Sequence, residues 1–224
     1  MSVRFVYFDL GNVLIRFSVH RMISQLVAVT EKSETEVRSM LFDYQRYRSY
    51  EIGETSTEEF LSQVYESLQP QEPNRDDLIH AINDVFWAND PILPIARKLA
   101  KLDVPRGILS NTNPLHWNYL ETAFPRIWDF FPRHKLASFQ VKALKPFPEI
   151  YQIALEEAKT ELPDLLPNEV LLIDDLEDNV KAAQEFGFQT IHYVEFEPFL
   201  EEYKKTGLPV PSRYKDEEEE QQTA

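Results

Sequence analysis

Cysteine is absent from the 224-residue chain, and glycine is scarce at five residues. Without cysteine the chain has no disulfide bond, no thiolate nucleophile and no cysteine-ligated zinc or iron–sulfur site. No apolar run reaches the roughly 18 residues that a membrane-spanning helix needs. The N-terminal segment MSVRFVYFDL has no charged region followed by a long apolar stretch, so no signal peptide is visible. We therefore expect a cytoplasmic protein.

Basic residues are the minority among the charged side chains. The chain has 23 Lys and Arg against 38 Asp and Glu, and its formal net charge is −15. Nucleic acids and anionic membranes bind basic surfaces, so we expect neither as a partner. A small phosphorylated metabolite stays compatible with this charge, because a lysine or a metal ion reverses its sign locally. The sequence leaves a monomer and a homodimer equally open.

Short apolar segments alternate with segments of helical periodicity along most of the chain. Helical patterns of about ten residues or more separate most of these short segments, which favours βαβ units. The sequence therefore predicts an α/β fold with a Rossmann-like parallel sheet. About five strands are expected, at residues 3–9, 104–110, 133–141, 169–175 and 188–194.

The segment after the first expected strand has helical patterns and no convincing strand. Expected features are a helix over 33–47, a capping box of Ser56 with Glu59, and a helix cap at Asn74. We interpret this segment as an all-helical insertion. The expected domains are an α/β core at 1–16 and 89–208, a helical cap at 17–88, and a disordered acidic tail at 209–224.

Polar side chains stand where the expected strands end. Because ligands bind at the carboxyl edge of open parallel sheets, these groups should converge. Crowded carboxylates repel one another unless a cation joins them, and hard oxygen ligands suit Mg²⁺. A lysine and a hydroxyl beside them can hold phosphate oxygens while one carboxylate acts as a nucleophile. The converging residues are Asp9, Ser110, Asn111, Lys145, Asp174 and Asp175.

Each of these motifs taken alone also has a purely structural explanation. Asp9, Gly11 and Asn12 are residue types that form turns. Ser110 and Asp174 are residue types that cap the helix following a strand. A lysine before proline, such as Lys145, is usually a surface residue. Four such coincidences at consecutive strand ends are improbable, so the joint pattern favours a functional site.

The segments YFDLGNVL, ILSNTN, LKPFPEIY and LLIDDLEDNVKAA resemble the four motifs of the haloacid dehalogenase (HAD) superfamily, in order and spacing, over about residues 3–195. Their wording is most similar to the bacterial glucose-1-phosphate phosphatase-like branch. YEIGETSTEEF also resembles a stretch in the helical cap of that branch. The resemblance implies a Mg²⁺-dependent phosphatase that acts through an aspartyl-phosphate.

The resemblance also implies a role for each site residue. Asp9 would be the catalytic nucleophile and a metal ligand, and catalytic Lys145 would neutralise both Asp9 and the phosphate. The remaining metal ligands would be Asp175, the backbone carbonyl of Gly11, and Asp174 as a ligand or a partner of one. The residues implied for phosphate binding are Asn12, Ser110, Asn111 and Lys145.

Gly11 is a departure from the superfamily pattern. Most of its phosphatases have a second aspartate at this position, which protonates the leaving oxygen and then activates water. Glycine offers no proton, and the amide of Asn12 has no usable one near pH 7. The general acid/base is therefore unassigned. The anomeric oxygen of a sugar leaves more readily than that of a simple alcohol, so hexose 1-phosphates are the first substrates expected.

Two other functions remain open at this point. One is a metal-independent 2-haloacid dehalogenase-like hydrolase, which also uses an aspartate nucleophile and lacks the second aspartate. The other is a non-catalytic HAD-fold protein that binds or regulates. In the cap, residues 44–51 form a polar and aromatic cluster that either packs on the core or closes over a substrate.

Overall fold

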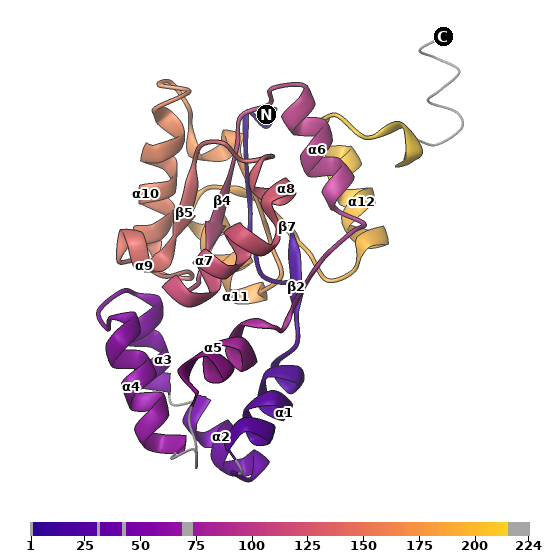
Figure 1. Cartoon of the computed structure of the whole chain (residues 1–224). Coiled ribbons are helices and arrows are strands. Elements are labelled where there is room, and N and C mark those ends of the chain that lie inside the picture. Colours follow the sequence, from indigo (N-terminus) through magenta and orange to yellow (C-terminus); the bar gives the residue numbers. More distant parts are fainter. Residues whose placement is uncertain (1, 31, 42–43, 69–73, 215–224) are drawn as a thin grey trace.

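The computed structural model describes residues 2–30, 32–41, 44–68 and 74–214 (Figure 1). Its main sheet has five strands in the order β5-β4-β1-β6-β7, and all of its neighbouring strands pair in parallel. The predicted α/β fold with a five-stranded parallel sheet and a helical insertion is confirmed. The strands are β1 (Phe5–Phe8), β4 (Arg106–Ser110), β5 (Lys135–Ala137), β6 (Val170–Asp174) and β7 (Gln189–His192).

The central strand β1 is apolar throughout because helices cover both faces of the sheet. Phe5 and Tyr7 belong to one buried cluster with α10 (Pro148–Lys159) and α11 (Glu177–Phe186). Val6 and Phe8 belong to the cluster on the opposite face. The helices of that second cluster are α6 (Leu93–Lys101), α7 (Pro114–Ala123), α8 (Pro125–Trp128) and α12 (Phe196–Lys205).

One expected strand is only partly a strand. In the segment 133–141, β5 ends at Ala137 and the short helix α9 (Ser138–Val141) follows. The buried side chain of Ser138 bonds to the backbone of Thr112, which turns the chain away from the sheet edge. Gly187, with a φ of +111°, ends α11 as its position after the helical pattern predicts.

The inserted helices form a second layer beneath the sheet in Figure 1, around a buried cluster of their own. The capping box of Ser56 with Glu59 and the cap at Asn74 are present as predicted. The single helix expected over 33–47 is wrong, because the structure has two separate helices here, and residues 42–43 between them lie outside the described residues. The helices of the layer are α1 (Val19–Thr30), α2 (Glu34–Leu41), α3 (Tyr44–Glu51), α4 (Thr57–Leu68) and α5 (Arg75–Asn83).

Two short strands that the sequence does not predict connect the layers. β2 (Ile15–Phe17) and β3 (Phe86–Ala88) pair antiparallel where the chain enters and leaves the helical layer. Three residues are too few for a strand pattern to stand out.

Two short 3₁₀ helices lie in the C-terminal half of the described chain: η1 (Pro167–Glu169) precedes β6, and η2 (Ser212–Tyr214) ends the described residues. The Tyr214 hydroxyl donates to the carbonyl of Pro91 at 2.8 Å, which ties the start of the expected tail to the core. The rest of that tail, 215–224, lies outside the described residues. Among the described helices, none combines the length and apolarity that crossing a membrane requires.

Candidate active site

The carboxyl edge of the sheet gathers the charged residues that the sequence singles out. Asp9 directly follows β1, Asp174 ends β6, and Lys145 follows α9. Parallel pairing brings them together, since the Asp9 amide donates to the carbonyl of Ile173 at 2.8 Å. All three side chains are buried, with exposed fractions of 7%, 0% and 3% for Asp9, Asp174 and Lys145. Charges this deeply buried persist only when they are paired.

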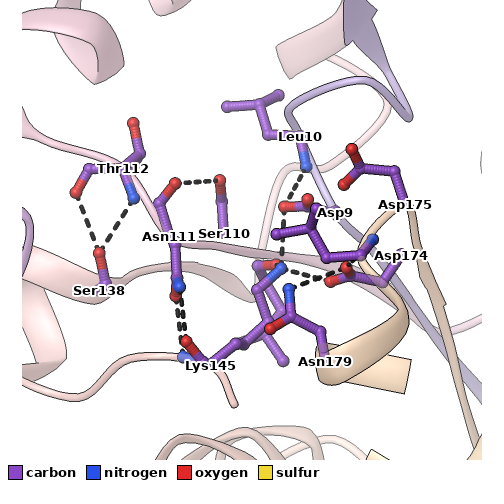
Figure 2. Close-up of polar contacts among 12 residues, drawn as sticks. Asp9, Leu10, Ser110, Asn111, Thr112, Ser138, Lys145, Asp174, Asp175 and Asn179 are labelled. Carbon is purple, nitrogen blue, oxygen red and sulfur yellow. Dashed lines mark hydrogen bonds and ion pairs between the residues drawn. The ribbon is translucent and has the colours of Figure 1, made fainter. Parts of the chain in front are cut away.

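Lys145 provides the pairing (Figure 2). Its Nζ lies 2.6 Å from Asp174 Oδ2 and 3.0 Å from Asp9 Oδ1, and it donates to the carbonyl of Leu109 at 2.8 Å. Burial alone would lower the pKa of Lys145, but the two carboxylates outweigh it and raise the pKa. Lys145 is therefore a permanently charged core residue and not a surface lysine.

Asp174 holds this lysine in place. Its second oxygen, Oδ1, accepts from the Leu176 amide at 3.0 Å and from Asn179 Nδ2 at 2.9 Å. Both carboxylate oxygens of Asp174 thus have donors within the protein. This arrangement fixes the direction in which Asp174 presents its charge to Lys145.

Among the described residues, Asp9 is held through one of its two carboxylate oxygens. Lys145 and the Leu10 amide, at 2.7 Å, both contact its Oδ1, and within the described chain Oδ2 is the oxygen left to bond elsewhere. Burial raises the pKa of Asp9, and the negative charges of Asp174 and Asp175 raise it further, whereas Lys145 opposes the shift. A second cation beside these carboxylates would lower their mutual repulsion.

The geometry fits such a cation. One oxygen from each of Asp9, Asp174 and Asp175 lies within 4.8 Å of the others. Carboxylate oxygens without any soft ligand are the donor set that Mg²⁺ prefers. The carbonyl of Gly11 accepts from the Val13 amide at 2.7 Å and keeps a second lone pair.

Asn12 and Asn111 orient other site residues in this structure. Asn12 Nδ2 donates to Asp175 Oδ2 at 2.9 Å. Asn111 donates to the carbonyl of Lys145 at 2.8 Å and accepts from the Lys145 amide at 2.9 Å. Within the described residues, the hydroxyl of Ser110, which is buried at the end of β4, has a long 3.4 Å contact with the carbonyl of Asn111 as its one hydrogen bond. Its hydroxyl is the more available of these groups for a ligand.

A cavity of about 830 Å³ separates this sheet edge from the helical layer. Gly11, Ser110, Asn111 and Lys145 line its core side. Its remaining wall is largely apolar, a feature that sequence reasoning missed because the residues come from many separate segments. That wall includes Leu10, Ile15, Phe17, Val19, Met22, Leu41, Val85, Phe86, Leu120, Leu144 and Phe147.

Some residues of the 44–51 cluster line the cavity, and another packs inside the helical layer. Tyr47, Arg48 and Glu51 line the cavity. Tyr50 is buried and stacks on Phe60 with ring centroids 4.2 Å apart, so it belongs to the packing of the helical layer. The side chain of Tyr44 lies outside the described residues.

The chain belongs to the haloacid dehalogenase-like hydrolase family, whose sequence model matches residues 3–187. This confirms the superfamily that the four motifs indicate. The match includes the whole inserted helical layer and every residue of the charged cluster described above.

Solved structures share the fold across nearly the whole chain. The HAD family enzyme BT-2542 from Bacteroides thetaiotaomicron superposes with a TM-score of 0.76 and 26% identity, over 91% of this chain and 99% of that one. The complex of that enzyme with magnesium and inorganic phosphate superposes with a TM-score of 0.71 and 27% identity, over 86% of this chain and 95% of that one. A predicted HAD-like family hydrolase from Porphyromonas gingivalis superposes with a TM-score of 0.74 and 25% identity, over 94% of this chain and 100% of that one.

Curated relatives match over a shorter stretch. Bifunctional epoxide hydrolase 2 of Rattus norvegicus is 36% identical over 77 residues, which are 34% of this chain and 13% of that protein. The mouse counterpart is 36% identical over 89 residues, 36% of this chain and 15% of that protein. The chain thus matches only a small part of these relatives' length.

Proposed function

We propose that the protein is a Mg²⁺-dependent phosphatase of small phosphorylated metabolites. The observation that carries the proposal is the buried Lys145 between Asp9 and Asp174, with Asp175 close by and a large cavity in front. A cation and a lysine at one carboxylate nucleophile are what transfer of a dianionic phosphoryl group requires. The similar enzyme BT-2542, whose complex contains magnesium and inorganic phosphate, supports this choice.

The proposed reaction has two displacements at phosphorus. Asp9 Oδ2 attacks, an O–P bond forms, and the bond to the leaving oxygen breaks, which gives an aspartyl-phosphate. Water then attacks phosphorus, the bond to Asp9 breaks, and inorganic phosphate leaves. The Ser110 hydroxyl donates to a phosphate oxygen, and the positive charge of Lys145 offsets the phosphate charge, through both steps.

The same sheet edge would provide the ligands for the metal ion. A bound Mg²⁺ would be held by Asp9, Asp175 and the Gly11 carbonyl, with Asp174 beside them, and would neutralise phosphate charge. Because Asp174 already satisfies Lys145 and Asn179, its main contribution is to orient the lysine. Asn12 and Asn111 support the site by fixing Asp175 and Lys145.

Two kinds of leaving group deserve the first tests. Hexose 1-phosphates follow from the resemblance to the glucose-1-phosphate phosphatase-like branch. The apolar wall of the cavity favours a second kind, phosphate esters with an aromatic or branched alkyl leaving group, since such groups gain free energy by leaving water. Tyr47, Arg48 and Glu51 are the polar groups of the helical layer that would meet either one.

The test is phosphate release from a panel of both ester kinds, with and without Mg²⁺. We expect release that depends on Mg²⁺. No release from any ester by folded protein would contradict the proposal and favour the non-catalytic alternative. Halide release from 2-chloropropionate without metal would instead support the dehalogenase alternative.

A further inference from the structure

The proposed reaction moves a proton twice, and among the described residues the sheet edge offers no group free to carry it. The leaving oxygen must gain a proton, and the attacking water must lose one. Gly11 has no side chain, Asp174 is fixed by its donors, and Lys145 is held charged by two carboxylates. Asp175 accepts from Asn12 and is a proposed metal ligand, so its carboxylate is already in use. The proton carrier must therefore come from the other side of the cavity, if the proposed function is correct.

Glu51, the last residue of α3, is held against the core at that place. The Ser138 hydroxyl donates to the Glu51 carbonyl at 2.7 Å, and the same hydroxyl oxygen accepts from the Thr112 amide at 3.0 Å. Thr112 follows Ser110 and Asn111 directly, so the backbone of Glu51 is coupled to the loop that ends β4.

The next turn closes tightly on the same part of the core. Gly53 has a φ of +74°, and a Cβ added there would lie 2.4 Å from the carbonyl oxygen of Phe139. Only glycine allows the helical layer to approach α9 this closely. The position of Glu51 relative to the sheet edge is thus built into the backbone.

The side chain of Glu51 lines the cavity together with Gly11, Ser110 and Lys145. Burial raises its pKa to about 7, and no charged or hydrogen-bonding neighbour among the described residues contributes to that shift. Protonated and ionised forms therefore coexist near neutral pH, as a group that gives and takes a proton requires.

The other titratable groups that line this cavity are poorly suited to this task. Burial lowers the pKa of His116 to about 4 and raises that of Tyr47, so both remain neutral near pH 7. The guanidinium carbon of Arg48 lies over the Phe147 ring, 5.2 Å from the ring centroid. Lys145 faces the cavity from the core side and stays charged.

We propose that Glu51 takes over the proton transfers for which Gly11 has no side chain. In the first step the Glu51 carboxyl proton goes to the leaving oxygen as its bond to phosphorus breaks. In the second step the Glu51 carboxylate takes a proton from the water that attacks phosphorus, and the Asp9–phosphorus bond breaks. Glu51 ends protonated again, so the cycle balances.

The test compares phenyl phosphate with p-nitrophenyl phosphate, two probes of similar size whose leaving groups differ in their need for a proton. First-turnover release of phenol and of p-nitrophenol is measured with Mg²⁺ for the wild type, Glu51→Gln and the matched control Glu54→Gln. Glu54 is exposed and lies in the same turn, outside this cavity.

For Glu51→Gln we expect phenol release to fall about 10²–10⁴-fold and p-nitrophenol release to fall far less. Phenol release by the wild type should decline as the pH rises through about 7, and the variant should lack this decline. Glu54→Gln should match the wild type. Equal losses on both probes, or none, would overturn the role of Glu51 alone. Failure of the wild type on every ester would overturn the proposed function itself.

Discussion

Carboxylates occur in two opposite electrostatic settings, around the cavity-lining Lys145 on the sheet side and on the cavity wall of the helical layer. On the sheet side, Asp9 and Asp174 lie 3.0 Å and 2.6 Å from Lys145 and are almost completely buried. On the helical side, Glu51 is partly exposed, and burial without a paired cation raises its pKa to about 7. Under the proposed function, these two surroundings suit the same chemical group to two different tasks.

The difference shows how the fold divides the work. A rigid parallel sheet fixes charges to within a few tenths of an ångström, which suits a nucleophile and a metal site. An inserted helical layer can bring a single neutral acid to the opposite side without disturbing those charges. Each prediction below alters one side and leaves the other intact.

The largest effect should follow from Asp9→Asn. This change removes the proposed nucleophile, so phosphate release should fall on the order of 10⁴-fold or more, as for other nucleophile deletions. The assay is steady-state phosphate release with Mg²⁺. Asp103→Asn is the control, because Asp103 is exposed, precedes β4 at the opposite edge of the sheet, and has a φ of +52° that Asn tolerates. Full activity of Asp9→Asn would contradict the assignment.

The substitution Lys145→Met should have the second largest effect. Two buried carboxylates would lose their cation, so the free energy of unfolding should fall by about 3–5 kcal/mol and activity by about 10²-fold or more. Urea unfolding and phosphate release measure the two effects. Adding Asp174→Asn should recover part of the stability and none of the activity. Recovery of activity would show that Lys145 has only a structural role.

Gly53→Ala tests the role of Glu51 by changing its position and not its side chain. Its Cβ would collide with the Phe139 carbonyl, push Glu51 away from the sheet edge, and lower activity by about 10–10²-fold. Gly207→Ala is a matched control, since its φ is +75° and nothing lies within 4 Å of the added Cβ. Both variants carry the backbone strain, and only the first should lose activity in excess of its loss of stability.

The smallest effect concerns stability and pH. Because the pKa of Glu51 is raised from 4.5 to about 7 in the folded protein, its contribution to stability is complete below pH 4.5 and is lost as the pH rises through about 7. Glu51→Gln should therefore match the wild type at pH 4 and exceed its free energy of unfolding by about 1–2 kcal/mol at pH 8, allowing for partial exposure. Chemical unfolding at the two pH values measures this. Equal stability at both would show that the Glu51 carboxyl is fully hydrated.

Much of the sheet edge was predictable because it depends on local patterns. Apolar strands that end in Asp9, Ser110 and Asp174 are visible in sequence, and parallel pairing then brings their ends together. What Asn111 and Asn12 bind was not predictable, since their partners lie far away in the chain. Those contacts depend on how separate segments pack.

The helical layer was less predictable for the same reason. Its helices and caps follow from periodicity, but the cavity wall combines residues from both layers. The sequence places Glu51 at the end of the 44–51 cluster, but it does not show that Glu51 lines the cavity while Glu54, three residues away, is exposed. Only the tertiary structure shows which of the two faces Lys145 across the cavity.

The most direct test of this division of work is the phosphorylation state of Asp9 during turnover. Wild type and Glu51→Gln are mixed with p-nitrophenyl phosphate and Mg²⁺, quenched in acid, and digested for mass spectrometry. We predict a phosphoryl group on Asp9, present only briefly in the wild type and accumulating in Glu51→Gln, which still takes the phosphoryl group but activates water poorly. Release of p-nitrophenol by both proteins without any phosphoryl group on Asp9 would contradict the account.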